Sequence, residues 1–150
     1  MKAAVQRVRS ASVCVDGAAV GQINQGLLVY LGVAAQDGPA QIRWLADKIA
    51  NLRIFDASST EKTSLSVRDI GGAVLVISQF TLLADARKGR RPSFSGAAAP
   101  DVAKALYETF IAELSQIVPV ESGVFAADMQ VESVNDGPFT LLLEHPTIAV

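Results

Sequence analysis

The chain has 150 residues and a formal net charge of −2; half of its residues are hydrophobic and 19% are charged. These values predict one globular domain over residues 1–150 and exclude a disordered chain. The small net charge argues against nucleic-acid binding through the whole surface. The single cysteine, Cys14, excludes an intramolecular disulfide. No apolar run approaches the roughly 20 residues that span a bilayer, so we expect no membrane partner and a cytoplasmic location.

The first third of the chain predicts strands followed by a helix. Residues 3–9 and 11–15 alternate between apolar and polar, and Asp16-Gly17 is a typical hairpin turn before a strand over 18–23. Residues 27–34 form a continuous apolar run, which is typical of a strand buried on both faces. The helix is expected to begin near Pro39. Its buried stripe comprises Ile42, Leu45, Ile49 and Leu52.

The remainder predicts a second buried strand over 73–77, a helix from about Pro100 that ends before Pro119, and strands over 120–125 and 128–134. A tight turn at 135–138 and a last strand at 139–144 follow, before a tail at 145–150. Two helices cannot cover both faces of so many strands. The expected fold is therefore a three-layer α/β/β arrangement, with antiparallel and mixed sheets rolled into a partial barrel and both helices on one side.

Small polar groups and a dense basic loop follow the strand over 73–77. Ser78, Gln79 and Thr81 stand at the end of the strand, and the cations come shortly after them. These cations are Arg87, Lys88, Arg90 and Arg91, around Gly89. A rigid strand end beside positive charge could hold an anionic substrate. The alternative is a core strand followed by a solvated loop.

Several common catalytic patterns are missing. The sole histidine, His145, lies in the tail, and the chain has no G-x-S-x-G, Walker loop, G-x-G-x-x-G or Cys/His metal spacing. We therefore expect no metal site and no cofactor. An enzyme with this sequence would have to work with backbone groups, hydroxyls and the functional groups of its substrate.

Two motifs in order carry a resemblance. The first is Ser78-Gln79-Phe80-Thr81-Leu82, continued by the segment over 88–94, and the second is Gly137-Pro138-x-Thr140 after Asn135. Together they closely resemble the D-aminoacyl-tRNA deacylase family. Shorter matches at 6–8, 11–13, 71–75 and 125–129 extend the resemblance over about residues 1–144.

The resemblance implies an enzyme that hydrolyses the ester bond of D-aminoacyl-tRNA and releases free D-amino acid and tRNA. Mischarged glycyl-tRNA is a further candidate substrate. The catalytic positions would be Gln79, Phe80 and Thr81, with backbone N–H groups near Phe80 and Thr81 stabilising the oxyanion. The ribose 2′-hydroxyl of the tRNA would help to activate water. The basic loop, Arg87, Lys88, Arg90 and Arg91, would bind the acceptor end.

The resemblance also implies a homodimer in which Gly137-Pro138 of one subunit enters the site of the other. Such a turn could read chirality through main-chain atoms, because proline fixes φ and glycine permits close approach. Ser78, Gly137, Pro138 and Arg7 would bind substrate. We expect Gly137-Pro138 to be cis and Arg7 to brace it.

Two other functions remain open from the sequence. The chain could be a non-catalytic RNA-binding module that uses the basic loop over 87–91, although this does not account for the Gly-Pro turn. It could also hydrolyse a free ester or a peptide.

Overall fold

The computed structural model describes residues 1–145, so most of the expected tail, residues 146–150, lies outside the described part. The elements in chain order are β1 (Lys2–Val15), β2 (Ala18–Ile23), β3 (Gly26–Gly32), α1 (Pro39–Asn51), β4 (Ala73–Ser78), the short 3₁₀ helix η1 (Phe80–Leu83), α2 (Pro100–Ser115), β5 (Val120–Ser122) and β6 (Gln130–Glu144). Within residues 1–145, no helix is long and apolar enough to cross a membrane.

The strand β1 organises the sheet because it changes partner halfway along. Residues 2–8 pair with β3, residues 11–15 pair with β2, and β6 follows β1 over most of its length. The sheet order is β2-β1-β3-β4-β5, with β6 beside β1. The two strands predicted over 3–9 and 11–15 are therefore one continuous strand. Because its second half pairs with β2, β2 lies against β4 and β5.

The sheet has two cores, one on each face of β3 and β4. Leu27, Val29 and Val76 pack toward the helices, in a cluster that includes Phe110 and Leu114. Leu28, Leu75 and Ile77 pack on the other face, inside the fold of the sheet; that cluster also holds Val8, Val13 and Ile23. Both apolar runs predicted to be buried on two faces are confirmed.

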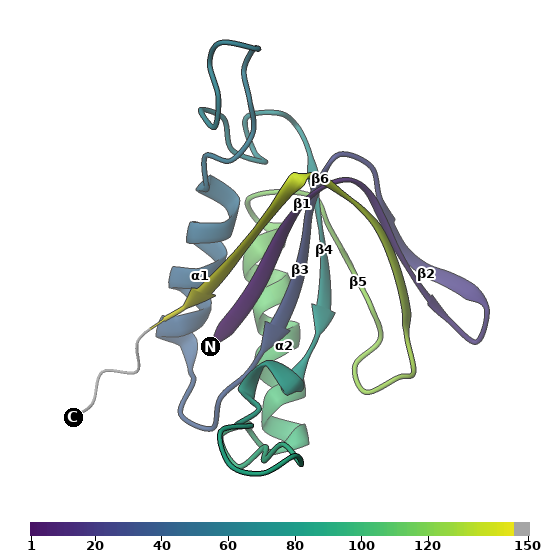
Figure 1. The fold of residues 1–150 in the computed structure, drawn as a ribbon, viewed down its shortest axis with the longest axis vertical. Helices are drawn as coiled ribbons and strands as arrows, with labels where there is room; N and C mark the ends of the chain where they lie inside the picture. The colour runs from purple at the N-terminus through teal and green to yellow at the C-terminus, as the bar shows by residue number, and fades with distance from the viewer. Residues whose placement is uncertain (146–150) are drawn as a thin grey trace.

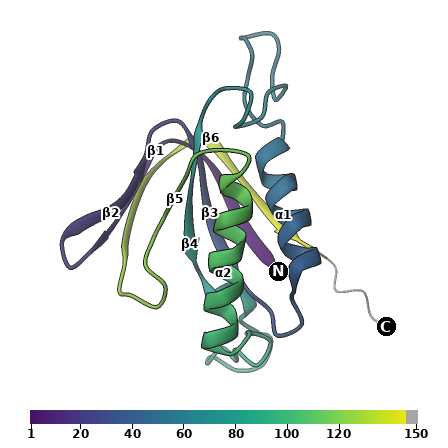
Figure 2. The same ribbon diagram turned by 180° about the vertical axis from the view of Figure 1, so that it is seen from behind.

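Both helices cover the same face of the sheet (Figure 1 and Figure 2). The predicted α/β/β arrangement with a barrel-like sheet is confirmed, and its two β layers belong to a single sheet folded over itself. The predicted positions at which the two helices begin, Pro39 and Pro100, are also confirmed. At the first of these, the Gly38 N–H donates to the Gln41 side-chain oxygen at 2.9 Å, which satisfies a free amide of the helix end.

The C-terminal strands differ from the prediction. The strand expected over 120–125 ends at Ser122. The strand expected over 128–134 begins at Gln130 and runs through the predicted turn at 135–138 to Glu144. The extra residues are absorbed as a bulge, because β1 offers a continuous partner on both sides of the turn.

A substitution at Gly26 tests the close approach of β3 and β4. A Cβ at Gly26 would lie 1.8 Å from the Ala73 carbonyl oxygen. Because a backbone atom cannot move aside without opening the sheet, we expect Gly26→Ala to lower the free energy of unfolding by about 3 kcal/mol. Urea denaturation measures this change. In Gly96→Ala, the nearest atom is 3.9 Å away, and the expected change is within about 0.5 kcal/mol. Equal stability of the two variants would contradict the packing described here.

Candidate active site

The first group of predicted site residues lies where β4 ends. Ser78 pairs with Leu31 of β3, and the Gln79 N–H donates to the Leu31 carbonyl at 2.8 Å before the chain turns into η1. The Gln79 side-chain amide donates to the Thr81 hydroxyl oxygen. The sheet thus fixes Ser78 and Gln79, and the turn that follows holds Phe80 and Thr81 beside them.

The backbone amides of Phe80 and Thr81 have no hydrogen-bond acceptor among residues 1–145. The first amides of a helical turn have no partner within that turn, which explains why these two donors are free. Both residues are exposed. Two free donors on a rigid strand end can bind an oxygen that develops negative charge.

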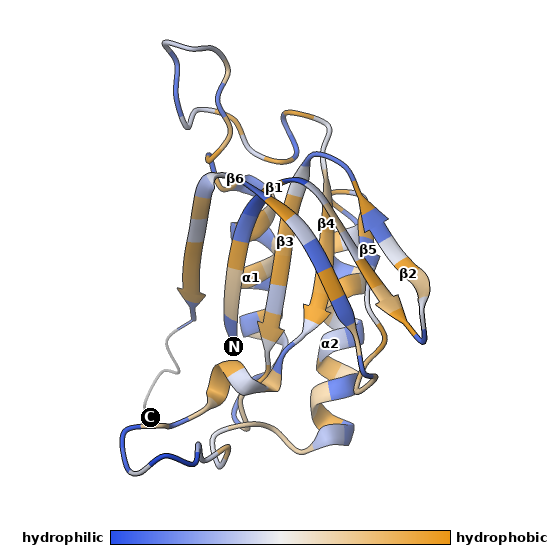
Figure 3. Cartoon of the chain, turned by 45° about the vertical axis from the view of Figure 1, so that its right-hand side comes forward, coloured by the Kyte–Doolittle hydropathy of each residue, from blue (hydrophilic) through white to orange (hydrophobic). Residues whose placement is uncertain are grey.

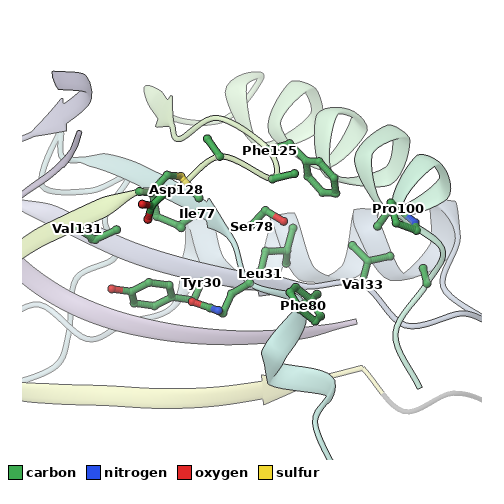
Figure 4. A pocket seen from close by; sticks show the side chains of 16 residues that line it. Tyr30, Leu31, Val33, Ile77, Ser78, Phe80, Pro100, Phe125, Asp128 and Val131 are labelled. Atoms are coloured by element: carbon green, nitrogen blue, oxygen red, sulfur yellow. The ribbon is translucent and has the colours of Figure 1, made fainter. Parts of the chain in front are cut away.

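A cavity of about 560 Å³ opens beside this strand end (Figure 4). Its floor is formed by Ile77 and Ser78 of β4, and Phe80 lies at its edge. Tyr30 of β3 lines another side, and burial raises the pKa of its phenol, so the hydroxyl stays protonated at neutral pH. The size and the largely apolar lining suit a small aromatic group.

The far wall of the cavity is the segment between β5 and β6. It contributes Phe125, Ala126, Asp128 and Met129. The chain turns here, with the Ala127 N–H donating to the Val124 carbonyl at 3.2 Å and Ala126 at a φ of 62°. The ring of Phe125 packs against Tyr107. No residue pattern in the sequence indicates a role for this wall or for Tyr30, although residues 125–129 belong to the stretch that resembles the family.

The basic loop projects from the same end of the molecule as a hydrophilic segment below the strands (Figure 3). Its base is closed by two backbone hydrogen bonds between Asp85 and Ser93, of 2.8 and 2.9 Å. All four predicted cations are exposed. Asp85 accepts two hydrogen bonds from the Arg87 guanidinium, at 2.9 and 2.7 Å, which lower the pKa of Asp85 and raise that of Arg87.

The other three cations of the loop, Lys88, Arg90 and Arg91, make no ion pair within residues 1–145. Their charge is therefore available to a ligand, whereas that of Arg87 is partly balanced. Nor do the described residues contain a group of three or more His, Cys, Asp or Glu side chains that could hold a metal ion.

The second motif forms a bulge on β6. Residues 136–139 lie opposite the single residue Arg7, because Thr140 pairs with Gln6 and Asn135 pairs with Val8. The Phe139 N–H donates to the Asn135 side-chain oxygen at 2.9 Å, which closes the base of the bulge. Gly137 and Pro138 are exposed at its tip, and the expected cis peptide between them is confirmed.

The expected bracing by Arg7 is also confirmed. Its guanidinium donates to the Asp136 carbonyl at 3.0 Å and to the Ile54 carbonyl at 2.6 Å. It also lies over the ring of Phe139, 5.0 Å from the centroid. The arginine thus joins the bulge to the segment after α1.

The two motifs do not meet within one chain. Ser78 pairs with Leu31, which pairs with Ala3, whereas the bulge lies opposite Arg7. Four residues along β1 correspond to about 13 Å, before the width of the intervening strands is added. The strand pairing therefore places the bulge and the end of β4 at separate positions in one chain.

Comparison with known proteins gives consistent results. A family model described as D-Tyr-tRNA(Tyr) deacylase matches residues 4–144. The chain is 57% identical over 145 residues to a D-aminoacyl-tRNA deacylase of Syntrophobacter fumaroxidans, covering 96% of this chain and 97% of the relative. It is 59% identical over 145 residues to a D-aminoacyl-tRNA deacylase of Anaeromyxobacter dehalogenans, with the same coverage of both chains.

Two solved structures share the fold. One, described as c-Myc DNA unwinding element binding protein, has a TM-score of 0.93 and 39% identity, over 98% of this chain and all of the other. The second, described as a probable eukaryotic D-amino acid tRNA deacylase, has a TM-score of 0.82 over 95% of this chain and 97% of the other. At 19% identity it supports the fold alone. The family model and the two bacterial relatives extend over nearly the whole chain, including both motifs, and the chain therefore belongs to the D-Tyr-tRNA(Tyr) deacylase family.

Proposed function

We propose that this chain hydrolyses the ester bond of D-aminoacyl-tRNA and releases free D-amino acid and tRNA. Two relatives more than half identical to it carry the name D-aminoacyl-tRNA deacylase. The observation that carries the proposal is the pair of free amides at Phe80 and Thr81, which stand beside a cavity and next to a basic loop. The free amides match an ester carbonyl, the cavity matches a nucleoside, and the basic loop matches a chain of phosphates.

The cavity takes the terminal adenosine. Its volume of about 560 Å³ admits a nucleoside, and Phe125 and Tyr30 supply aromatic walls for the base. The protonated Tyr30 hydroxyl can donate a hydrogen bond, and the carboxylate of Asp128 can accept one. With the adenosine in this cavity, the ester at its ribose lies near Phe80 and Thr81.

Hydrolysis then relies on backbone groups and on the substrate. The amides of Phe80 and Thr81 donate to the carbonyl oxygen as it becomes an oxyanion, and one such donor typically contributes about 3 kcal/mol to the transition state. The ribose 2′-hydroxyl helps to activate the attacking water. Gln79 donates to the Thr81 hydroxyl oxygen, which leaves the Thr81 proton free to position the substrate.

Chirality is read by Gly137-Pro138 of a partner subunit in a homodimer. The bulge is exposed, carries little side chain at its tip, and lies too far from Thr81 to act within its own chain. A main-chain surface near Cα rejects the L-isomer by steric clash and accepts many D side chains. Arg7 and Asn135 hold that surface in place. Glycyl-tRNA has no side chain at Cα and would not clash with this surface, so it is also a candidate substrate.

The basic loop binds the phosphates of the tRNA acceptor end through Lys88, Arg90 and Arg91, with a smaller share from the paired Arg87. We further infer that residues 1–150 act as one domain in the cytoplasm, where aminoacylated tRNA is used.

A second function, nucleic-acid binding without catalysis, is favoured by one comparison. A neighbour at 39% identity is described as a DNA unwinding element binding protein. Such a role would use the basic loop and leave the bulge and the free amides without a purpose. Release of labelled amino acid from D-tyrosyl-tRNA, with L-tyrosyl-tRNA spared, distinguishes the two functions.

The role of Thr81 is tested by removal of its hydroxyl. We expect Thr81→Ala to retain measurable turnover of D-tyrosyl-tRNA, because the backbone amide remains. Within residues 1–145 the hydrogen-bond partner of the Thr81 hydroxyl is the Gln79 amide, which is not a base that could make the hydroxyl a nucleophile. Single-turnover kinetics with labelled substrate measures the rate. Mass spectrometry of acid-quenched wild-type enzyme should detect no covalent acyl group. An ester on Thr81 would overturn this role.

The basic loop is tested by Arg90→Ala combined with Arg91→Ala. We expect KM for D-aminoacyl-tRNA to rise about tenfold, and the slope of log KM against log salt to fall by about 1.5, because two phosphate contacts no longer release counterions. The matched control replaces Arg43 and Lys48, which are exposed on α1, with the same loss of charge. If both double variants keep the wild-type salt slope, the loop is only a solvated surface.

The bracing of the bulge is tested at Arg7. Arg7→Ala leaves the Asp136 and Ile54 carbonyls without this donor, so the tip should lose its fixed position. We expect kcat/KM for D-tyrosyl-tRNA to fall about 10- to 100-fold. The ratio of D to L turnover should fall as well, with the circular dichroism spectrum retained. Arg43→Ala, which makes the same substitution at an exposed position on α1, serves as the control and should leave the D to L ratio unchanged. An unchanged D to L ratio in Arg7→Ala would rule out the positioning role.

A further inference from the structure

Two aromatic side chains are exposed at the active-site end of the molecule. Phe80 and Phe94 are 54% and 38% exposed, and their ring centroids lie 5.0 Å apart at an angle of 62°. Burial of a phenylalanine ring stabilises a fold, so leaving two rings partly in water on one patch forgoes stability. Phe94 has no part in the catalytic arrangement described above.

The positions of the two rings relate them to the substrate. Phe80 lines the edge of the adenosine cavity, and Phe94 contacts Phe80 on the side of the basic loop. Phe94 is also fixed in place. The residue before it, Ser93, makes two backbone hydrogen bonds with Asp85 at the base of the loop. The Phe94 carbonyl accepts a hydrogen bond from the Ala97 N–H at 3.0 Å. The aromatic pair thus lies between the cavity and the cations.

Aromatic faces next to a positively charged track are the usual way in which proteins hold unpaired nucleotides. We propose that Phe94, together with Phe80, forms a stacking surface for the base of the nucleotide that precedes the terminal adenosine. The phosphates on either side of that nucleotide run toward Lys88, Arg90 and Arg91. This inference rests on the proposed function, since it assumes that the adenosine occupies the cavity.

The charge around the pair favours RNA over a second copy of the chain as its occupant. Lys88, Arg90 and Arg91 make no ion pair within residues 1–145, and they lie on the loop that Asp85 and Ser93 close, directly before Phe94. Two copies that met through this patch would bring their cations together, which is repulsive. A phosphate chain would be attracted by the same charges.

The experiment compares a long and a short substrate. We expect Phe94→Ala to raise KM for D-tyrosyl-tRNA about 5- to 140-fold, the range of one lost base stack, with little change in kcat. For 3′-O-(D-tyrosyl)adenosine, which lacks the preceding nucleotide, KM and kcat should stay at the wild-type values. Phe94→Trp should restore the low KM for the tRNA. Val20→Ala, a truncation of a side chain 41% exposed on β2, is the matched control and should leave both substrates unaffected.

A direct measurement of stacking uses a short RNA that ends in adenosine with 2-aminopurine as the preceding base. Its fluorescence should be quenched by the wild-type protein and less so by Phe94→Ala. An equal loss of activity on both substrates, unchanged KM for the tRNA, or a change in oligomeric state in Phe94→Ala would each overturn the proposal. Failure of the wild-type protein to hydrolyse either D-tyrosyl ester would instead contradict the proposed function.

Discussion

β3 and β4 pair in parallel from Gly26 opposite Ala73 to Leu31 opposite Ser78, and apolar side chains cover both faces of the pair. A strand buried on two faces cannot shift its register without exposing one core or the other. The end of β4 is therefore held rigidly, and so is the point at which the backbone turns into η1. The free amides of Phe80 and Thr81 acquire their fixed direction from this packing, and the cavity opens where the packing stops. Oxyanion stabilisation depends on such preorganised donors.

The bulge on β6 is held by a different kind of interaction. Its anchor is Arg7, whose side chain is 12% exposed and donates to two backbone carbonyls. A desolvated guanidinium is costly unless its donors are satisfied, and charge-assisted hydrogen bonds offset that cost. Arg7 belongs to β1, which pairs with β2, β3 and β6. The tip of the bulge at Gly137, next to Arg7, is therefore held by the same sheet that holds the end of β4.

Much of this could be predicted from the sequence, for physical reasons. The continuous apolar runs at β3 and β4 leave no alternative to burial on both faces, and the proline-led, 3.6-periodic segments give both helices. Other features depend on contacts distant in the chain. The merging of the first two strands into β1 is set by its partners, and the cavity wall from Phe125 to Met129 is a loop without periodicity. The Asp85–Arg87 pair could not be inferred because it needs the conformation of the loop.

The proposed site uses side chains for the parts that all D-aminoacyl-tRNA substrates share and backbone atoms near the part that varies. Under the proposed function, the terminal adenosine and the phosphates are the same in every substrate, so side chains at the positions of Phe125 and Arg90 would recognise them without limiting the range of amino acids. The amino-acid side chain varies, and any pocket shaped for one residue would exclude others. Under the proposed function, recognition near Cα is therefore left to backbone atoms, at Phe80 and Thr81 in one subunit and at Gly137-Pro138 in the partner subunit of the proposed homodimer. On this reading, affinity comes from the RNA and selectivity from the main chain, and the two can change independently.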